Sequence, residues 1–141
     1  MTTDTPLFVL DSFALLAFFQ AEPSGLRVRE LLDQAGRGEV SLAITTVNLG
    51  EVAYRTERRY GLKRTQAVLA KIEEYAPAVI DVNRELALAA AHLKAQHHMS
   101  YADCLAAALA QRLDAAVVTG DPDFRQVEHL VAVEWLQSGD Q

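Results

Sequence analysis

The sequence predicts an α/β fold: a single three-layer domain over residues 1–141, with a mostly parallel central sheet flanked by helices. Short apolar runs alternate along the whole chain with longer segments of helical pattern. Strands that alternate with helices of about ten or more residues form βαβ units, which build parallel sheets. The length of 141 residues fits one domain, and no repeat, low-complexity tract or Pro/Gly-rich linker divides it.

In the first half of the chain, β-rich apolar runs predict two strands and apolar positions at helical spacing predict four helices. The strands cover 7–10 and 40–44, and the helices cover 12–20, 24–35, 47–60 and 62–75. Ser24 is the expected N-cap of the second helix, and Gly36 and Gly38 supply its stop. Phe13 is expected in the core.

The second half of the chain repeats the alternation. The strands cover 78–82, 116–119 and 131–135, and the helices cover 83–97 and 100–113. Asn83 and Ser100 are the expected N-caps of these two helices. In such a fold, a ligand site is expected at the carboxyl ends of the strands.

The single cysteine and the apolar runs bear on the compartment. Cys104 has no partner for an internal disulfide and is expected to be a small buried residue, which fits a reducing, intracellular setting. No basic residue precedes Arg27, and the apolar runs 13–19 and 105–110 are far shorter than the roughly 20 residues that span a bilayer. We expect a cytoplasmic protein with no membrane segment.

Five acidic residues from four separate parts of the chain are placed to meet at one edge of the sheet. Asp11 and Asp121 follow predicted strands, and Asp123 comes two residues later. Glu51 and Asp103 lie in the first turns of predicted helices, which face the same edge.

Each acid also has a purely structural explanation. Asp11 is placed to cap the helix after it, and Asp103 completes a sequence like a capping box with Ser100. The two acids of the Asp-Pro-Asp segment suit a turn. Glu51 is spaced to form an i,i+4 ion pair with Arg55, worth about 0.3–0.5 kcal/mol.

Taken together, the five acids favour a cation site. Carboxylates within a few Å of one another repel, so they raise their own pKa values or recruit cations. Oxygen ligands without His or Cys select Mg²⁺ or Mn²⁺ rather than zinc. Such ions lower the pKa of a bound water and stabilise the leaving oxygen of a phosphodiester. The sequence therefore predicts metal-assisted phosphodiester hydrolysis.

Four motifs in order along the chain match this chemistry. They are Val9-Leu10-Asp11-Ser12, Asn48-Leu49-Gly50-Glu51-Val52, Ser100-Tyr101-Ala102-Asp103-Cys104 and Val118-Thr119-Gly120-Asp121-Pro122-Asp123-Phe124. They resemble the motifs of PIN-domain ribonucleases, and within them the VapC-like toxins of type II toxin–antitoxin pairs. The last one closely resembles the family's T-G-D-x-D-F element, and the resemblance covers nearly the whole chain.

The resemblance implies a Mg²⁺- or Mn²⁺-dependent endoribonuclease that leaves a 5′-phosphate and a 3′-hydroxyl. It assigns catalysis and metal binding to a quartet, namely Asp11, Glu51, Asp103 and Asp121, with Asp123 as an auxiliary metal ligand. Ser12 and Thr119 stand beside the acids, as auxiliary groups that orient a ligand or phosphate, or as backbone caps. A homodimer and a cognate antitoxin that blocks the site are also implied.

A basic segment follows Glu51. Five of the 13 basic residues fall within ten positions, with one acid among them: Arg55, Arg58, Arg59, Lys63 and Arg64. On a helical wheel Arg55 and Arg58 lie within about 40° of Glu51, so they share its face. Guanidinium groups suit phosphate oxygens, which predicts RNA contact; contact with an acidic antitoxin segment is an equal alternative.

The net charge of −6 at first argues against a nucleic-acid binder. Without the five candidate site acids, however, the chain has 14 acidic and 13 basic residues, so its acidic surplus is mostly the site itself. A receiver domain is excluded, because no acid neighbours Asp11 and no lysine follows Lys94. A non-catalytic PIN scaffold that binds RNA or protein stays open as the alternative.

Overall fold

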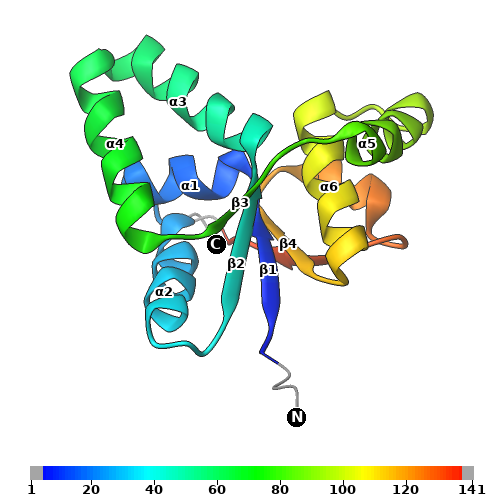
Figure 1. Cartoon of the computed structure of the whole chain (residues 1–141), viewed down its shortest axis with the longest axis horizontal. Helices are drawn as coiled ribbons and strands as arrows, with labels where there is room; N and C mark the ends of the chain where they lie inside the picture. Colours follow the sequence, from blue (N-terminus) through cyan, green and yellow to red (C-terminus); the bar gives the residue numbers. More distant parts are fainter. Residues whose placement is uncertain (1–4, 138–141) are drawn as a thin grey trace.

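Five strands form one sheet in the computed structural model, which describes residues 5–137 (Figure 1). They are β1 (Leu7–Leu10), β2 (Ser41–Thr45), β3 (Ala78–Ile80), β4 (Ala116–Thr119) and β5 (Ala132–Trp135). Every pairing is parallel, and the strand order is β3-β2-β1-β4-β5. The chain therefore builds outward from β1 in one direction and then in the other, and this confirms the predicted parallel sheet.

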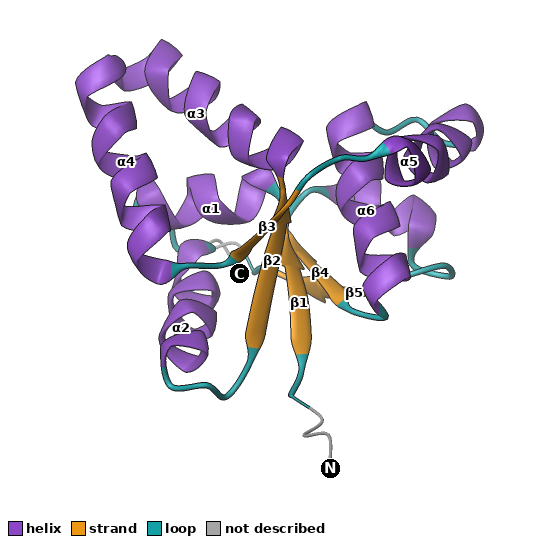
Figure 2. Cartoon of the chain, in the orientation of Figure 1, coloured by secondary structure: helices purple, strands orange, loops and turns teal. Residues whose placement is uncertain are grey.

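Helices cover both faces of the sheet (Figure 2). The described residues form α1 (Ser12–Phe19), α2 (Gly25–Gly36), α3 (Thr46–Tyr60), α4 (Leu62–Tyr75), α5 (Arg84–Gln96), α6 (Tyr101–Leu113) and the short 3₁₀ helix η1 (Pro122–Val127). The first four helices lie on one side, and α5 and α6 lie on the other. Three layers result, as predicted.

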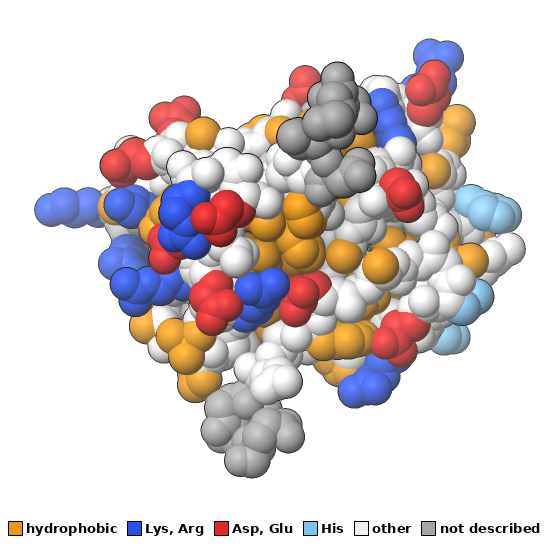
Figure 3. Space-filling view, turned by 90° about the horizontal axis from the view of Figure 1, so that it is seen from below, with side chains coloured by type: hydrophobic (Ala, Val, Ile, Leu, Met, Phe, Trp, Pro, Cys, Tyr) orange, Lys and Arg blue, Asp and Glu red, His pale blue; other side chains and the backbone are white. Residues whose placement is uncertain are grey.

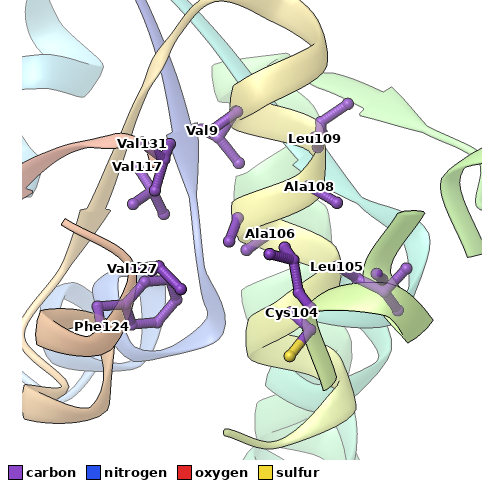
Figure 4. Packing of buried hydrophobic residues seen from close by; sticks show 14 of the residues in the cluster. Val9, Cys104, Leu105, Ala106, Ala108, Leu109, Val117, Phe124, Val127 and Val131 are labelled. Atoms are coloured by element: carbon purple, nitrogen blue, oxygen red, sulfur yellow. The ribbon is translucent and has the colours of Figure 1, made fainter. Parts of the chain in front are cut away.

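Two apolar cores fill the space between the layers, because successive strand residues point to opposite faces of a sheet. Val9 belongs to the core under α5 and α6, whereas the next residue, Leu10, belongs to the core under α1 and α2. Figure 4 shows Val9 and Val117 facing α6, with Phe124 contributed by η1. Cys104 is buried in this core, as predicted.

Local capping agrees with the sequence at three of four predicted sites. Asp11, Asn83 and Ser100 each accept a hydrogen bond from the backbone N–H three residues later. The prediction for Ser24 is wrong: its side chain makes no cap bond, and its backbone is already helical. The carbonyls of Glu22 and Pro23 accept from the first N–H groups of α2 instead.

Three further expectations are corrected. Phe13 is not in the core, since its side chain is 36% exposed at the start of α1, against Gly120. The third strand ends at Ile80 rather than at residue 82, because its partner strand β2 ends at Thr45, which is the residue paired with Ile80. The 3₁₀ helix η1 lies where a simple turn was expected.

The surface at the amino ends of the strands has no single sign of charge. Viewed from below in Figure 3, acidic and basic side chains are mixed, and histidines gather at the right-hand edge, on the side of α5 and α6. Within residues 5–137, no helix is long and apolar enough to cross a membrane.

Candidate active site

In the sheet, β2 and β3 lie on one side of β1, whereas β4 and β5 lie on the other, so the strand order changes direction between β1 and β4 (Figure 1). The loops after these two strands diverge at such a switch point and leave room for a ligand. Asp11 directly follows β1 and donates its backbone N–H to the carbonyl of Val118, at 3.4 Å. Asp121 follows β4 by two residues. The two acids that end strands therefore meet at the carboxyl edge, as predicted.

Asp11 carries a buried carboxylate oxygen with no hydrogen-bond partner. Its side chain is 1% exposed, and its Oδ1 accepts a hydrogen bond from the Ala14 N–H at 2.9 Å, which caps α1. The other oxygen, Oδ2, makes no hydrogen bond of good geometry, although the Thr119 hydroxyl lies near enough to the carboxyl group to lower its pKa in part. A buried, unpaired carboxylate oxygen is costly, so such a group calls for a proton or a cation. Capping of α1 therefore accounts for Oδ1 of Asp11 but not for Oδ2.

Three carboxylates cluster at the same edge, and the charges of two of them, Asp103 and Asp121, act on Asp11. Asp103, Asp121 and Asp123 each offer an oxygen, and these oxygens lie within 4.8 Å of one another. Asp103 is buried, Asp121 is half-buried and Asp123 is exposed, so the group spans from the interior to solvent. Backbone bonds hold it: Asp123 donates its N–H to Oδ1 of Asp121 at 2.9 Å. All four are drawn together from three distant parts of the chain.

Burial and mutual repulsion raise the pKa of two of these acids. Burial raises the pKa of Asp11 to about 8, with smaller contributions from the charges of Asp103 and Asp121; the Thr119 hydroxyl and the Ala14 N–H lower it in part. Burial and the charge of Asp121 raise the pKa of Asp103 to about 6. A divalent cation among these oxygens would remove the repulsion.

Glu51 lies beside this group rather than within it. Its Oε1 accepts a 2.5 Å hydrogen bond from the Ser12 hydroxyl, and its Oε2 lies 3.4 Å from Nε of Arg55. Its charge is close enough to raise the pKa of Asp103. The predicted ion pair with Arg55 therefore forms, and Glu51 lies outside the group of three carboxylates whose oxygens come within 4.8 Å of one another.

The two predicted auxiliary residues are both buried at this edge. Ser12 points its hydroxyl to Glu51, and the Thr119 hydroxyl accepts a hydrogen bond from the Asp121 N–H at 3.0 Å. Each therefore orients one acid of the group. The bond of Thr119 is to a backbone N–H, which agrees with the backbone-cap alternative, whereas Ser12 binds a side chain.

Two positioning residues were missed by the sequence analysis. Asn48 is fully buried and donates from Nδ2 to the carbonyl of Ala102, at 3.2 Å, which ties the start of α3 to the start of α6. Gln126 accepts from the His98 N–H at 2.9 Å and donates to the His98 carbonyl at 3.1 Å. These bonds join η1 to the segment before α6. A lone amide side chain in a sequence gives no signal for such a long-range bond.

The donor set suits a hard divalent cation. Every side chain of the group is a carboxylate, and one oxygen of the most buried member has no partner. Oxygen donors of this kind fit Mg²⁺ or Mn²⁺. The oxygens that come close enough to share one ion belong to Asp103, Asp121 and Asp123, and Asp11 lies beside the first two.

A family model, that of the PIN domain, matches residues 8–130. The chain belongs to the PIN domain family. PIN domains are typically nucleases, a class of hydrolases, and they typically use divalent metal ions. The chain matches no curated protein.

Several solved structures similar to this PIN domain come from toxin–antitoxin systems. The chain is similar to VapBC2 from Rickettsia felis bound to a promoter DNA fragment, at a TM-score of 0.73 and 18% identity over 93% of this chain and 99% of that one. For DNA-bound VapBC from Salmonella typhimurium, the TM-score is 0.72 and the identity is 20%, over 94% of this chain and 99% of that one. For VapC20 from Mycobacterium tuberculosis, described as a Sarcin-Ricin loop cleaving toxin, the TM-score is 0.69 and the identity is 18%, over 85% of this chain and 94% of that one. At these identities, the likeness shows the VapC-like fold.

The basic segment of this PIN domain divides into two parts. Arg59 donates to the side chain of Gln20 at 3.3 Å, and Arg64 donates to the carbonyl of Phe19 at 3.2 Å. Both therefore bind the C-terminal end of α1, where cations stabilise the exposed carbonyls. Arg55 and Arg58 lie nearer the acids on α3, and Lys63 is exposed at the start of α4.

A polar groove of about 300 Å³ runs between α1 and α3. Phe13, Gln20, Arg55 and Arg59 are among the residues that line it. Arg55, which lines the groove, also pairs with Glu51.

Proposed function

We propose that this PIN domain is a Mg²⁺- or Mn²⁺-dependent endoribonuclease and the toxin of a toxin–antitoxin pair. The observation that carries the catalytic part is the buried, unpartnered Oδ2 of Asp11 beside the three gathered carboxylates. A structural carboxylate in that position would be paired, and a merely acidic surface would not include a side chain that is 1% exposed.

Each acid and hydroxyl of the candidate site has a distinct proposed role. Asp11, Asp103 and Asp121 would hold the ion, and Asp123 would assist from the solvent side. When bound, a divalent ion would lower the pKa of water and neutralise the charge that develops on a phosphodiester. Glu51, oriented by Ser12, is the fourth acid of the proposed catalytic quartet. Thr119 keeps Asp121 in place.

The basic segment is the proposed RNA-binding surface. Arg55, Arg58 and Lys63 are exposed and available to phosphates, and Arg59 and Arg64 form the rim next to α1. Guanidinium groups one helical turn apart, at about 6 Å, suit successive phosphates of an extended strand. The acidic antitoxin contact stays an alternative use of the same surface.

The partners are proposed from the similar structures. Several of these are toxin–antitoxin complexes, which supports a cognate antitoxin and, for a toxin acting on cellular RNA, a cytoplasmic location. A homodimer is also proposed. Light scattering of the purified chain tests the dimer, and co-expression with the gene product encoded beside it tests the antitoxin by complex formation and loss of nuclease activity.

The nuclease assay uses total RNA with Mg²⁺, with Mn²⁺ or with chelator. We expect cleavage with either ion and none with chelator or with Asp11→Asn. Asp114→Asn is the matched control, because Asp114 is an exposed aspartate at the far end of α6 whose backbone (φ 53°) also suits asparagine. RNA decay that is equal in Asp11→Asn, or absent from the wild type, would favour the non-catalytic scaffold.

A further inference from the structure

One face of α3 combines an acid, an aromatic ring and two guanidinium groups. Glu51, Tyr54, Arg55 and Arg58 are spaced i, i+3, i+4 and i+7, so they line up along the same side of the helix. Three contacts join them. Arg55 pairs with Glu51, the Tyr54 hydroxyl lies 3.5 Å from Oε2 of Glu51, and the Arg58 guanidinium lies 5.0 Å from the Tyr54 ring centroid.

Tyr54 has no structural task that accounts for its size. Its side chain is 46% exposed, and it belongs to neither apolar core of the described residues. A large aromatic side chain left in solvent forgoes the free energy of burial. Its hydroxyl donates to Oε2 of Glu51, an acid of the candidate active site. The ring is therefore held at the entrance to that site by Glu51 on one side and Arg58 on the other.

We propose that Tyr54 is a stacking platform for one unpaired base of an RNA substrate, at the nucleotide next to the phosphate that the acids receive. This inference rests on the proposed function and names a residue that would bind its substrate. Unstacked bases of single-stranded RNA bind to exposed aromatic rings, and neighbouring arginines add phosphate contacts and cation–π attraction. Tyr54 offers the ring, and Arg55 and Arg58 offer the charges.

The same chain provides a matched comparison in Tyr60. Tyr60 is 47% exposed and also lies next to two guanidinium groups, those of Arg59 and Arg64, at 5.3 and 5.9 Å from its ring centroid. Six residues farther along α3 than Tyr54, it is displaced from the acids by about 9 Å more along the helix axis. Its two arginines are tied to the end of α1. Tyr60 thus has the same chemistry without the proximity to Glu51.

The test measures the affinity of two labelled probes by fluorescence anisotropy, with Ca²⁺ in place of Mg²⁺ and gels to show that the probes stay intact. One probe is an oligouridylate of roughly ten nucleotides, and the other is an abasic ribose-phosphate chain of the same length. We expect Tyr54→Ala to weaken oligouridylate binding about tenfold and to leave abasic binding unchanged. Tyr54→Phe and Tyr54→Trp retain the affinity, because the ring and not the hydroxyl binds the base. Tyr60→Ala has no effect on either probe.

Three results would overturn the stacking role. The first is that Tyr54→Ala loses the same affinity for both probes. The second is that Tyr60→Ala loses as much oligouridylate affinity as Tyr54→Ala. The third is that Tyr54→Ala keeps its oligouridylate affinity. The first of these also marks the face as a phosphate or protein contact. In all three, a wild type that still binds and cleaves RNA leaves the proposed ribonuclease function standing. A wild type that binds neither probe and cleaves no RNA removes both.

Discussion

The Ser12 hydroxyl donates a hydrogen bond of 2.5 Å to Oε1 of Glu51, across 39 residues of sequence. Ser12 is the first residue of α1, directly after Asp11, and Glu51 lies on α3. Ser12 is buried, and the Glu51 side chain is 13% exposed, so water competes little for this bond. A hydrogen bond to a charged acceptor contributes about 1.5–3 kcal/mol, which is enough to fix the position of the acid.

Ser12→Ala is expected to reduce kcat about tenfold and to change KM little, because it frees Glu51 without altering the basic surface that we propose binds RNA. The check is steady-state cleavage of a labelled RNA. On a Glu51→Gln background, the same substitution should have almost no further effect, since the two residues act through one bond. Additive losses would mean that Ser12 acts independently of Glu51.

The positions of the acids were predictable because they depend on fold topology. Asp11 and Asp121 follow strands, and parallel strands end at one edge, so alternation in the sequence was sufficient to bring them together. The ligand-like orientation of Ser12 and Thr119 was left open, since a hydroxyl beside an acid has several local partners. Only the packing of α1 against α3 decides that Ser12 donates to Glu51.

Stability in the absence of metal is expected to fall as the pH rises. An aspartate of the unfolded chain titrates near 3.8, whereas burial raises the pKa of Asp11 to about 8 in the folded protein. Between these values the folded state holds a proton that the unfolded chain has lost. Raising the pH therefore favours unfolding, by at most about 1.4 kcal/mol per pH unit for one proton. Asp103, whose pKa is raised to about 6, acts in the same direction over the lower part of this range.

Urea denaturation in chelator at pH 5 and pH 8 measures this effect. Asp11→Asn should flatten the pH dependence and raise the stability at pH 8, while the Asp114→Asn control keeps the wild-type slope. Added Mn²⁺ should restore the wild type at pH 8 and leave Asp11→Asn nearly unchanged. A metal-free wild type that is more stable at pH 8 than at pH 5 would contradict the raised pKa of Asp11.

Gln126 is expected to control how tightly the site holds a divalent ion. Its two bonds to His98 join η1, which carries Asp123, to the segment that leads into Asp103. Gln126→Ala removes both bonds, each worth about 0.5–1.5 kcal/mol. We expect Mn²⁺ affinity, measured by calorimetry, to fall roughly fivefold, with a melting temperature that changes by only a few degrees.

Gln111→Ala serves as the comparison for this prediction. Gln111 also uses its side-chain amide to bind a distant carbonyl, that of Leu130, but it does so at the opposite end of α6. Its replacement should leave Mn²⁺ affinity unchanged. If both variants lose affinity equally, the effect is one of general stability, and Gln126 has no special part in positioning the acids.

The errors of the sequence analysis have a common physical origin in contacts between distant segments. Phe13 was expected in the core because an aromatic residue in an apolar run is normally buried, yet its ring lies at the rim against Gly120. Ser24 is of a residue type that often caps helices. Gly25, however, packs so closely against α1 that a Cβ at this position would lie 2.6 Å from the Ala17 carbonyl oxygen. The first N–H groups of α2 are therefore bound by backbone carbonyls. Neither contact leaves a local pattern in the sequence.

The contact between Gly120 and Phe13 gives the last prediction. A Cβ at position 120 would overlap the edge of the Phe13 ring. Because that ring is 36% exposed, it is expected to move toward solvent rather than force the backbone, so Gly120→Ala should cost only about 1 kcal/mol of unfolding free energy. On a Phe13→Ala background the cost should disappear, and urea denaturation of the four proteins measures the coupling. A full cost that persists without the ring would show that the backbone between Thr119 and Asp121, not the aromatic contact, requires glycine.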